Sequence, residues 1–126
     1  MEFLDLNGLI DYNSADNILI KSFELKEDGK FSVKVSSFTN DLTVLITFSK
    51  NHHFMQFIDE SSMLQPDYFD FKSTSFFKVS ESKFLNLFHT MSCDIYKEYN
   101  FCHYGIFTMD KYFSIIAAED PKVIQL

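Results

Sequence analysis

The stretch ILIKSFELKEDGKFSVKVSSF, residues 18–38, decides the fold because apolar and polar side chains alternate on both sides of a turn signal. Phe31, Val33 and Val35 are separated by single polar residues, which is the period of a strand with one solvent-exposed face. Asp28-Gly29 is a favoured two-residue hairpin turn, since both positions tolerate positive φ. The sequence therefore predicts a β-hairpin here.

A third strand follows this hairpin. Thr39-Asn40-Asp41 is a second turn signal, and LTVLITFSK comes after it. Val44, Ile46 and Phe48 share one face of the third strand because side chains alternate along extended backbone. We expect residues 18–50 to form a three-stranded antiparallel meander.

Residues 81–99, ESKFLNLFHTMSCDIYKEY, predict one long helix. Ser80 is the expected N-cap, with Glu81 in the first turn. The apolar side chains that recur at helical spacing, and that we expect to be buried, are Phe84, Phe88, Met91, Ile95 and Tyr99. Leu85 and Leu87 widen this stripe beyond what one sheet face covers. Either a second element of the chain covers the helix, or part of it is a partner surface.

The remaining segments read as shorter strands. NHHFMQFIDESSMLQ predicts either a strand or a short helix. In YFDFKS and SFFKVS, apolar and polar residues alternate weakly, as they do in strands. Residues 100–118 form a plausible second hairpin, and EDPKVIQL adds a short edge strand. We expect one α+β domain over residues 1–126, in which a mostly antiparallel sheet packs against the helix at about 81–99.

Composition excludes several classes of protein. The chain has 126 residues, with 16 Phe, no Trp and a formal net charge of −7, and all 11 basic residues are lysine. Negative charge disfavours direct binding to nucleic acid or to anionic membranes. No segment resembles a signal peptide or a membrane span, so we expect a cytoplasmic protein with reduced thiols.

Four residues have metal-ligand chemistry but poor spacing. His89 and Cys93 are four apart on the expected helix and would face the same way. Cys102 and His103 are neighbours on an expected strand, so their side chains point to opposite faces. A structural zinc site needs four convergent ligands, so we expect no metal. Asp94 and Glu98 would raise the pKa of the Cys93 thiol, which argues against a Cys–His nucleophile.

No other catalytic constellation is present. His52-His53 is a tandem pair with no third ligand nearby, and Asp59-Glu60 are adjacent carboxylates that cannot be held apart in a cleft. The sequence contains no phosphate-binding glycine loop, serine elbow or metal-binding helix motif. We therefore expect a protein that is not an enzyme and that needs no cofactor.

An acidic segment interleaved with aromatic residues is the best candidate for a binding surface. Residues 51–71 contain no lysine. The candidate partner-binding residues are Asp59, Glu60, Asp67, Tyr68 and Asp70. An acidic rim around an aromatic anchor is suited to a basic partner. The alternative is a solvated acidic loop whose phenylalanines belong to the core. The first twenty residues are a second acidic stretch without lysine.

The overall profile of a short, acidic chain without catalytic motifs resembles that of small bacterial immunity proteins, such as those of contact-dependent growth-inhibition systems. The resemblance is one of character and carries no residue over. It implies a cytoplasmic protein that binds a cognate toxin domain, often a basic nuclease, and occludes its active site. Our leading hypothesis is therefore a non-catalytic inhibitor of the immunity type.

Two other hypotheses stay open at this point. One is a phage-encoded inhibitor of a host nuclease, of the anti-CRISPR kind, which gene context would distinguish. The other is a small enzyme or ligand-binding domain with a pocket between sheet and helix. A deep pocket where His89, Cys93 and Tyr96 converge would favour this last hypothesis.

Overall fold

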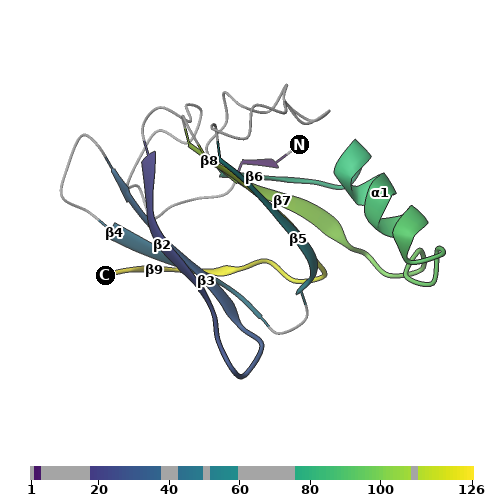
Figure 1. Ribbon diagram of the computed structural model, residues 1–126, viewed down its shortest axis with the longest axis horizontal. Coiled ribbons are helices and arrows are strands. Elements are labelled where there is room, and N and C mark those ends of the chain that lie inside the picture. The colour runs from purple at the N-terminus through teal and green to yellow at the C-terminus, as the bar shows by residue number, and fades with distance from the viewer. Residues whose placement is uncertain (1, 4–17, 38–42, 50–51, 60–75, 109–110) are drawn as a thin grey trace.

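The computed structural model describes residues 2–3, 18–37, 43–49, 52–59, 76–108 and 111–126. In this part of the chain, two antiparallel sheets stack face to face, and one helix lies on the outer face of the larger sheet (Figure 1). The protein is thus mostly antiparallel sheet with a short helix, in agreement with the coarse expectation from sequence. The three layers are a four-stranded sheet, a five-stranded sheet and the helix.

The four-stranded sheet contains the expected meander and one further strand. Its order is β2 (Ile18–Leu25), β3 (Phe31–Ser37), β4 (Thr43–Phe48) and β9 (Lys122–Gln125). The fourth strand comes from the end of the sequence and pairs with β4, matching Ile46 with Val123. The meander is therefore not a separate unit, because β9 returns from the other sheet to complete it.

The turn between β2 and β3 differs from the two-residue form expected. Lys26 N donates to Lys30 O at 2.8 Å, so that Glu27, Asp28 and Gly29 form a three-residue loop. In this loop only Gly29 has positive φ, at 89°. Asp28 instead accepts a hydrogen bond from Lys30 N through its carboxylate. A glycine in the left-handed region at the end of such a loop is the usual three-residue hairpin solution.

The five-stranded sheet has the order β1 (Glu2–Phe3), β6 (Phe76–Val79), β7 (Cys102–Phe107), β8 (Lys111–Ala117) and β5 (His52–Asp59). β7 and β8 form the expected second hairpin. Within the segment that could be strand or helix, residues 52–59 form the strand β5 at the sheet edge, and the rest lies outside the described residues. YFDFKS lies outside the described residues.

The main core fills the space between the two sheets. Side chains from β2, β3, β4, β6, β7 and β8 point inward, and ring contacts bridge the layers, as where Phe48 meets Tyr104 edge-on at 5.6 Å between centroids. The main core consists of Ile18, Ile20, Phe31, Val33, Val35, Val44, Ile46, Phe48, Phe76, Tyr104, Ile106, Phe113, Ile115 and Ala117. The main core is thus a sandwich core, formed by inward-facing side chains that alternate along the strands.

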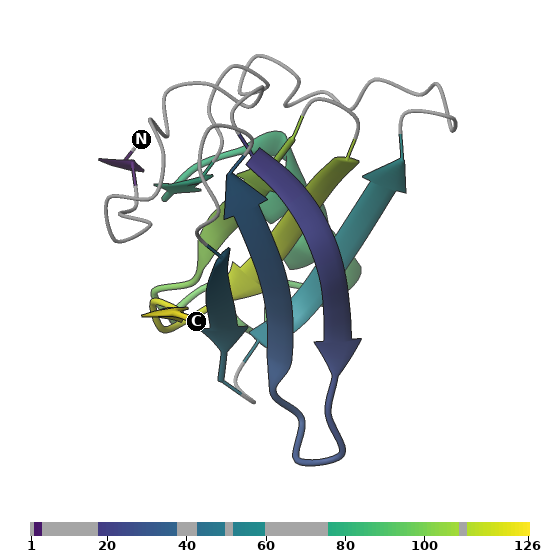
Figure 2. The same cartoon turned by 90° about the vertical axis from the view of Figure 1, so that its left-hand side faces the viewer.

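A second cluster lies on the opposite face of the five-stranded sheet, under the helix. It contains Phe77, Val79, Phe84, Leu85, Phe88, Phe101 and Ile116. Figure 2 shows the helix behind the larger sheet when the smaller sheet faces the viewer. The central strands β6, β7 and β8 of this sheet are therefore buried on both faces.

The helix is shorter than predicted. α1 spans Lys83–Met91, and its N-cap is Ser82, whose Oγ accepts from Leu85 N at 3.0 Å. Ser80 is not the cap, and Glu81 precedes the helix. At the other end, Ser92 donates its hydroxyl to Phe88 O at 2.7 Å. Ser92 Oγ shares the Phe88 carbonyl with the N–H of Ser92, and the positive φ of Cys93 and Asp94 ends the helical path, so the prediction of a helix to residue 99 was wrong.

The early end of α1 changes which residues are buried. Cys93 and Asp94 adopt left-handed backbone, with φ of 55° and 61°. This reversal removes the residues that follow from the helical face. Phe84 and Phe88 are buried as expected, but Met91, Ile95 and Tyr99 are exposed. The expected continuous stripe is therefore half core and half surface.

Candidate functional site

The acidic segment proposed from sequence lies mostly beyond the described residues. Asp59 is the last residue of β5, where its backbone is paired with Lys111 of β8. Glu60, Asp67, Tyr68 and Asp70 lie outside the described residues, and so does the side chain of Asp59. The structure nevertheless describes the two strand ends to which this segment is joined, Asp59 of β5 and Phe76 of β6.

The strand ends that adjoin four of the undescribed segments meet at one end of the sandwich. In the larger sheet the successive antiparallel pairings put Phe3, Asp59, Phe76 and Lys111 at the same end. In the smaller sheet, Ile18 pairs with Ser37 and Ser36 with Thr43, which also places three strand ends together. Figure 1 shows the starts of β2 and β8 at the same end of the stacked sheets. We call this the acidic end.

The charge of the chain is distributed very unevenly about this end. Residues 4–17, 38–42, 60–75 and 109–110 each join two strand ends there, and together they contain eight acidic residues and one lysine. The rest of the chain has ten acidic residues and ten lysines. The whole formal charge of −7 therefore belongs to segments anchored at the acidic end.

At the end opposite the acidic one, a buried tyrosine holds the connection between β8 and β9. Tyr104, in the main core, donates its hydroxyl to Asp120 at 2.6 Å, and Lys78 pairs with the same carboxylate at 3.0 Å. The Tyr104 hydrogen bond and then the Lys78 contacts hold the pKa of Asp120 below its usual range. Asp120 lies in the connection from β8 to β9, so these bonds join the two sheets at the end opposite the acidic one.

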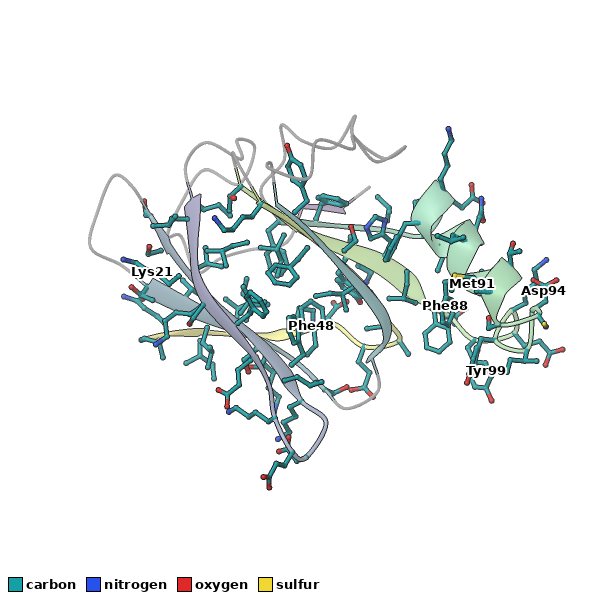
Figure 3. The ribbon with its side chains drawn as sticks, viewed as in Figure 1. Lys21, Phe48, Phe88, Met91, Asp94 and Tyr99 are labelled. Carbon is teal, nitrogen blue, oxygen red and sulfur yellow. The ribbon has the colours of Figure 1, made fainter. Side chains whose placement is uncertain are left out.

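A second candidate surface is an apolar ridge beside α1. It consists of Leu87, Met91, Ile95 and Tyr99, which are 48%, 62%, 66% and 61% exposed. Figure 3 shows Met91 and Tyr99 at the helical extremity of the molecule, far from Lys21 on β2. Clustered exposed apolar side chains mark interaction surfaces more often than single ones do. From the sequence, this region was expected either to be covered by another element of the chain or to be a partner surface. The exposure of its side chains favours a partner surface.

The histidines and cysteines do not gather into a site. Cys102 packs against the main core, whereas His103 lies on the opposite face of β7, against Phe84, as alternation had predicted. Cys93 is exposed beyond the end of α1, so it does not share a helical face with His89. Among the described residues, no three potential ligands could hold a metal ion.

His103 has a structural environment. Its Nδ1 lies 2.9 Å from the Oγ of Ser82, the helix cap. Because Ser82 Oγ already accepts from Leu85 N, its own proton can be donated to a neutral imidazole. Burial lowers the pKa of His103 from its ordinary 6.5 to about 4. The neutral ring therefore supports the helix start at neutral pH.

A shallow groove of about 260 Å³ lies on the outer face of the smaller sheet. Its walls come from β2, β3, β4 and Leu126, with Lys26, Lys34 and Glu24 among them. His89, Cys93 and Tyr96 do not line it. This groove is therefore not the pocket between sheet and helix that would have favoured a small enzyme.

Within the described residues, no helix combines the length and apolar character needed to cross a membrane. Comparison with known proteins found no matching family model, no matching curated protein and no matching solved structure.

Proposed function

We propose that this protein is a non-catalytic inhibitor of the immunity type, which binds a basic toxin domain, such as a nuclease, through its acidic end. The observation that carries the proposal is the charge segregation: segments with a net charge of −7 are anchored at one end of a framework whose own charges balance. Asp59, Glu60, Asp67, Tyr68 and Asp70 are the proposed contact residues.

Segregated charge has a physical consequence that scattered charge lacks. Interactions between exposed charges decay over about 8 Å at physiological ionic strength, so dispersed carboxylates act singly. Carboxylates concentrated at one end act together on an approaching cation-rich surface, raising the association rate and orienting the encounter. Nucleases present such surfaces because they must bind phosphates. An acidic end can therefore occupy the substrate channel of a nuclease.

A protein inhibitor also needs a rigid base for its binding segments. The acidic segments adjoin β3, β6 and β7, which are paired on both sides, as well as the edge strands β1, β2 and β5. A scaffold of this kind limits the ordering cost on binding. The same argument supports the phage-encoded inhibitor, which would use the same surface on a different nuclease.

The first step of the test is to identify the partner. The tagged chain is used to capture proteins from its native host, and a basic captured domain is purified and assayed for nuclease activity. One equivalent of the chain should reduce that activity to background. Between about 50 and 500 mM salt the association rate should fall by roughly 100-fold, as electrostatic steering requires.

Two charge-matched variants then locate the surface. The first combines Asp59→Asn, Glu60→Gln, Asp67→Asn and Asp70→Asn, and should slow association by about 10-fold or more. The second neutralises the same number of acids away from the acidic end, at Glu24, Glu27, Asp28 and Glu81, and should leave the rate within about two-fold. Equal effects of both variants, or persistent nuclease activity at one equivalent, would refute the proposal.

A further inference from the structure

The apolar ridge is a surface that the acidic end does not use. Leu87 and Met91 are four residues apart on α1 and share a face, and Ile95 and Tyr99 continue from the turns that follow. The ridge borders the second cluster, because the ring of Tyr99 contacts Tyr96 and Phe101, which in turn pack against Phe88. Its exposed side chains are thus held on a packed support.

The charges at the two ends of the ridge are of opposite sign. Lys83, one turn before Leu87 on the same face, is exposed, and Glu98, beside Tyr99, is also exposed. Neither forms an ion pair with another described residue, whereas Asp94 and Lys97 are paired with each other at 3.6 Å. Glu81 is exposed as well, but it lies before the N-cap and outside the helical face. The ridge therefore has a positive end and a negative end.

An apolar strip with opposite charges at its ends is complementary to itself. When two copies meet about a two-fold axis with their ridges antiparallel, Lys83 of each copy faces Glu98 of the other, and the Leu87 end of each apolar strip lies against the Tyr99 end of the other. Two-fold dimers use such self-complementary patches. A uniformly basic or acidic partner would match only one end of the ridge.

The distribution of net charge removes the usual obstacle to self-association. A chain with a charge of −7 repels its own copies, and this repulsion opposes dimers. Here the surplus charge belongs to segments anchored at the acidic end, while the ridge lies outside that end on the balanced part of the chain. Two copies joined at their ridges keep the acidic ends apart.

We propose that a second copy of this chain covers the ridge, forming an antiparallel two-fold dimer with reciprocal Lys83–Glu98 contacts. The patch is small beside the roughly 800 Å² per partner of a standard stable interface, so the dimer should be weak, with a Kd on the order of 10–100 µM. Such a dimer presents two acidic ends directed away from its axis.

The first experiment is sedimentation equilibrium of the full chain over a concentration series up to about 1 mM. The wild-type chain should pass from monomer to dimer, and Met91→Lys should weaken association by at least 10-fold. Leu25→Lys is the matched control, because Leu25 and Met91 are equally exposed, at 62%. It should leave the association constant unchanged, and far-UV circular dichroism should show both variants folded.

The second experiment tests the antiparallel geometry. Lys83→Glu and Glu98→Lys should each reduce dimerisation, because every homodimer then contains two like-charge contacts. An equimolar mixture of the two variants should restore it, because both reciprocal contacts in the mixed dimer again join opposite charges. A wild-type chain that stays monomeric, a control variant that dissociates equally, or a mixture that associates no better than either variant alone would each overturn the proposal.

Discussion

The two faces of the five-stranded sheet are buried by different means. The inner face meets another sheet through regular alternation, with Tyr104, Ile106, Phe113 and Ile115 among its contacts. The outer face is covered by a nine-residue helix and includes a buried histidine, a buried serine and a glycine under a phenylalanine ring. We infer that the inner face depends on volume, whereas the outer face depends on individual contacts.

The largest expected effect tests whether volume governs the inner face. Phe48 is fully buried and packs edge-on against Tyr104. Phe48→Ala should lower the free energy of unfolding by about 4 kcal/mol, because it removes a ring and leaves a cavity. Phe48→Leu, which keeps much of the volume, should cost less than half as much. Urea denaturation measures both.

The control for this prediction is Phe23→Ala. Phe23 contacts Phe31 and Phe113, but half of it is exposed, at 51%. Its loss should cost about 1 kcal/mol, since water already reaches the ring. If Phe48→Leu were as damaging as Phe48→Ala, the inner face would depend on ring shape, and the contrast between the two faces would disappear.

The next effect tests whether contact geometry governs the outer face. A Cβ at Gly105 would lie 2.1 Å from Cζ of Phe77, its cross-strand neighbour. The Phe77 ring is fully buried and cannot move away freely. Gly105→Ala should therefore destabilise the fold by about 3 kcal/mol, as overpacking of a close contact does.

A double-mutant cycle shows whether that cost comes from the Phe77 contact. Phe77→Leu alone should also destabilise the fold, because it shortens a buried side chain. Combined with Gly105→Ala, the loss should be at least about 1 kcal/mol smaller than the sum of the two single losses. Strict additivity would mean that the methyl group added at Gly105 is disfavoured for a reason other than the Phe77 ring.

The third prediction concerns pH and the buried histidine of the outer face. Because the pKa of His103 falls from 6.5 to about 4 on folding, the unfolded chain binds more protons between these values. The stabilisation is complete above about pH 6.5 and is lost progressively as the pH falls towards 4, and the loss amounts to about 2 kcal/mol by pH 5. His103→Leu should remove this part of the pH dependence.

The measurement is the difference in unfolding free energy between about pH 7.5 and pH 5, compared for the wild type and His103→Leu. Carboxylates titrate in both proteins, so their contribution cancels in the comparison. Ile115→Val is the control, because it removes one buried methyl group from the inner face and no titratable group, so it should leave the difference unchanged. Identical pH profiles for the wild type and His103→Leu would show that the ring is charged without penalty.

The contrast between the faces also explains what the sequence could predict. Alternation at Phe31, Val33 and Val35 is local, so the meander and its buried face were predictable. The end of α1 was not, because the reversal at Cys93 and Asp94 occurs without glycine or proline. Gly105 within a strand was a usable signal, since an isolated strand glycine often marks a close approach.

The candidate site also has features that the sequence could predict and features that it could not. The acidic residues are plain in the sequence, and Asp59, Asp67 and Asp70 were identified as a group. Which strand ends meet beside these segments depends on long-range pairings such as β5 with β8, and these could not be read from the sequence. The exposure of Met91 and Ile95 likewise required the helix end. Patterns along the chain predict faces, but they do not place distant segments beside one another.

The smallest expected change in stability concerns the inner face, where one buried side chain also makes a polar contact. Tyr104→Phe keeps the buried ring but removes the hydroxyl that binds Asp120, so unfolding should become easier by only about 1 kcal/mol. Because that bond is the main cause of the lowered Asp120 pKa, its stabilisation is present above the ordinary pKa of 3.8 and fades as the pH falls. Tyr99→Phe, on an exposed ring, is the control and should be neutral. NMR titration of the Asp120 carboxylate should show its pKa rising in Tyr104→Phe alone; an unchanged pKa would assign the shift to Lys78 and leave the inner face governed by volume throughout.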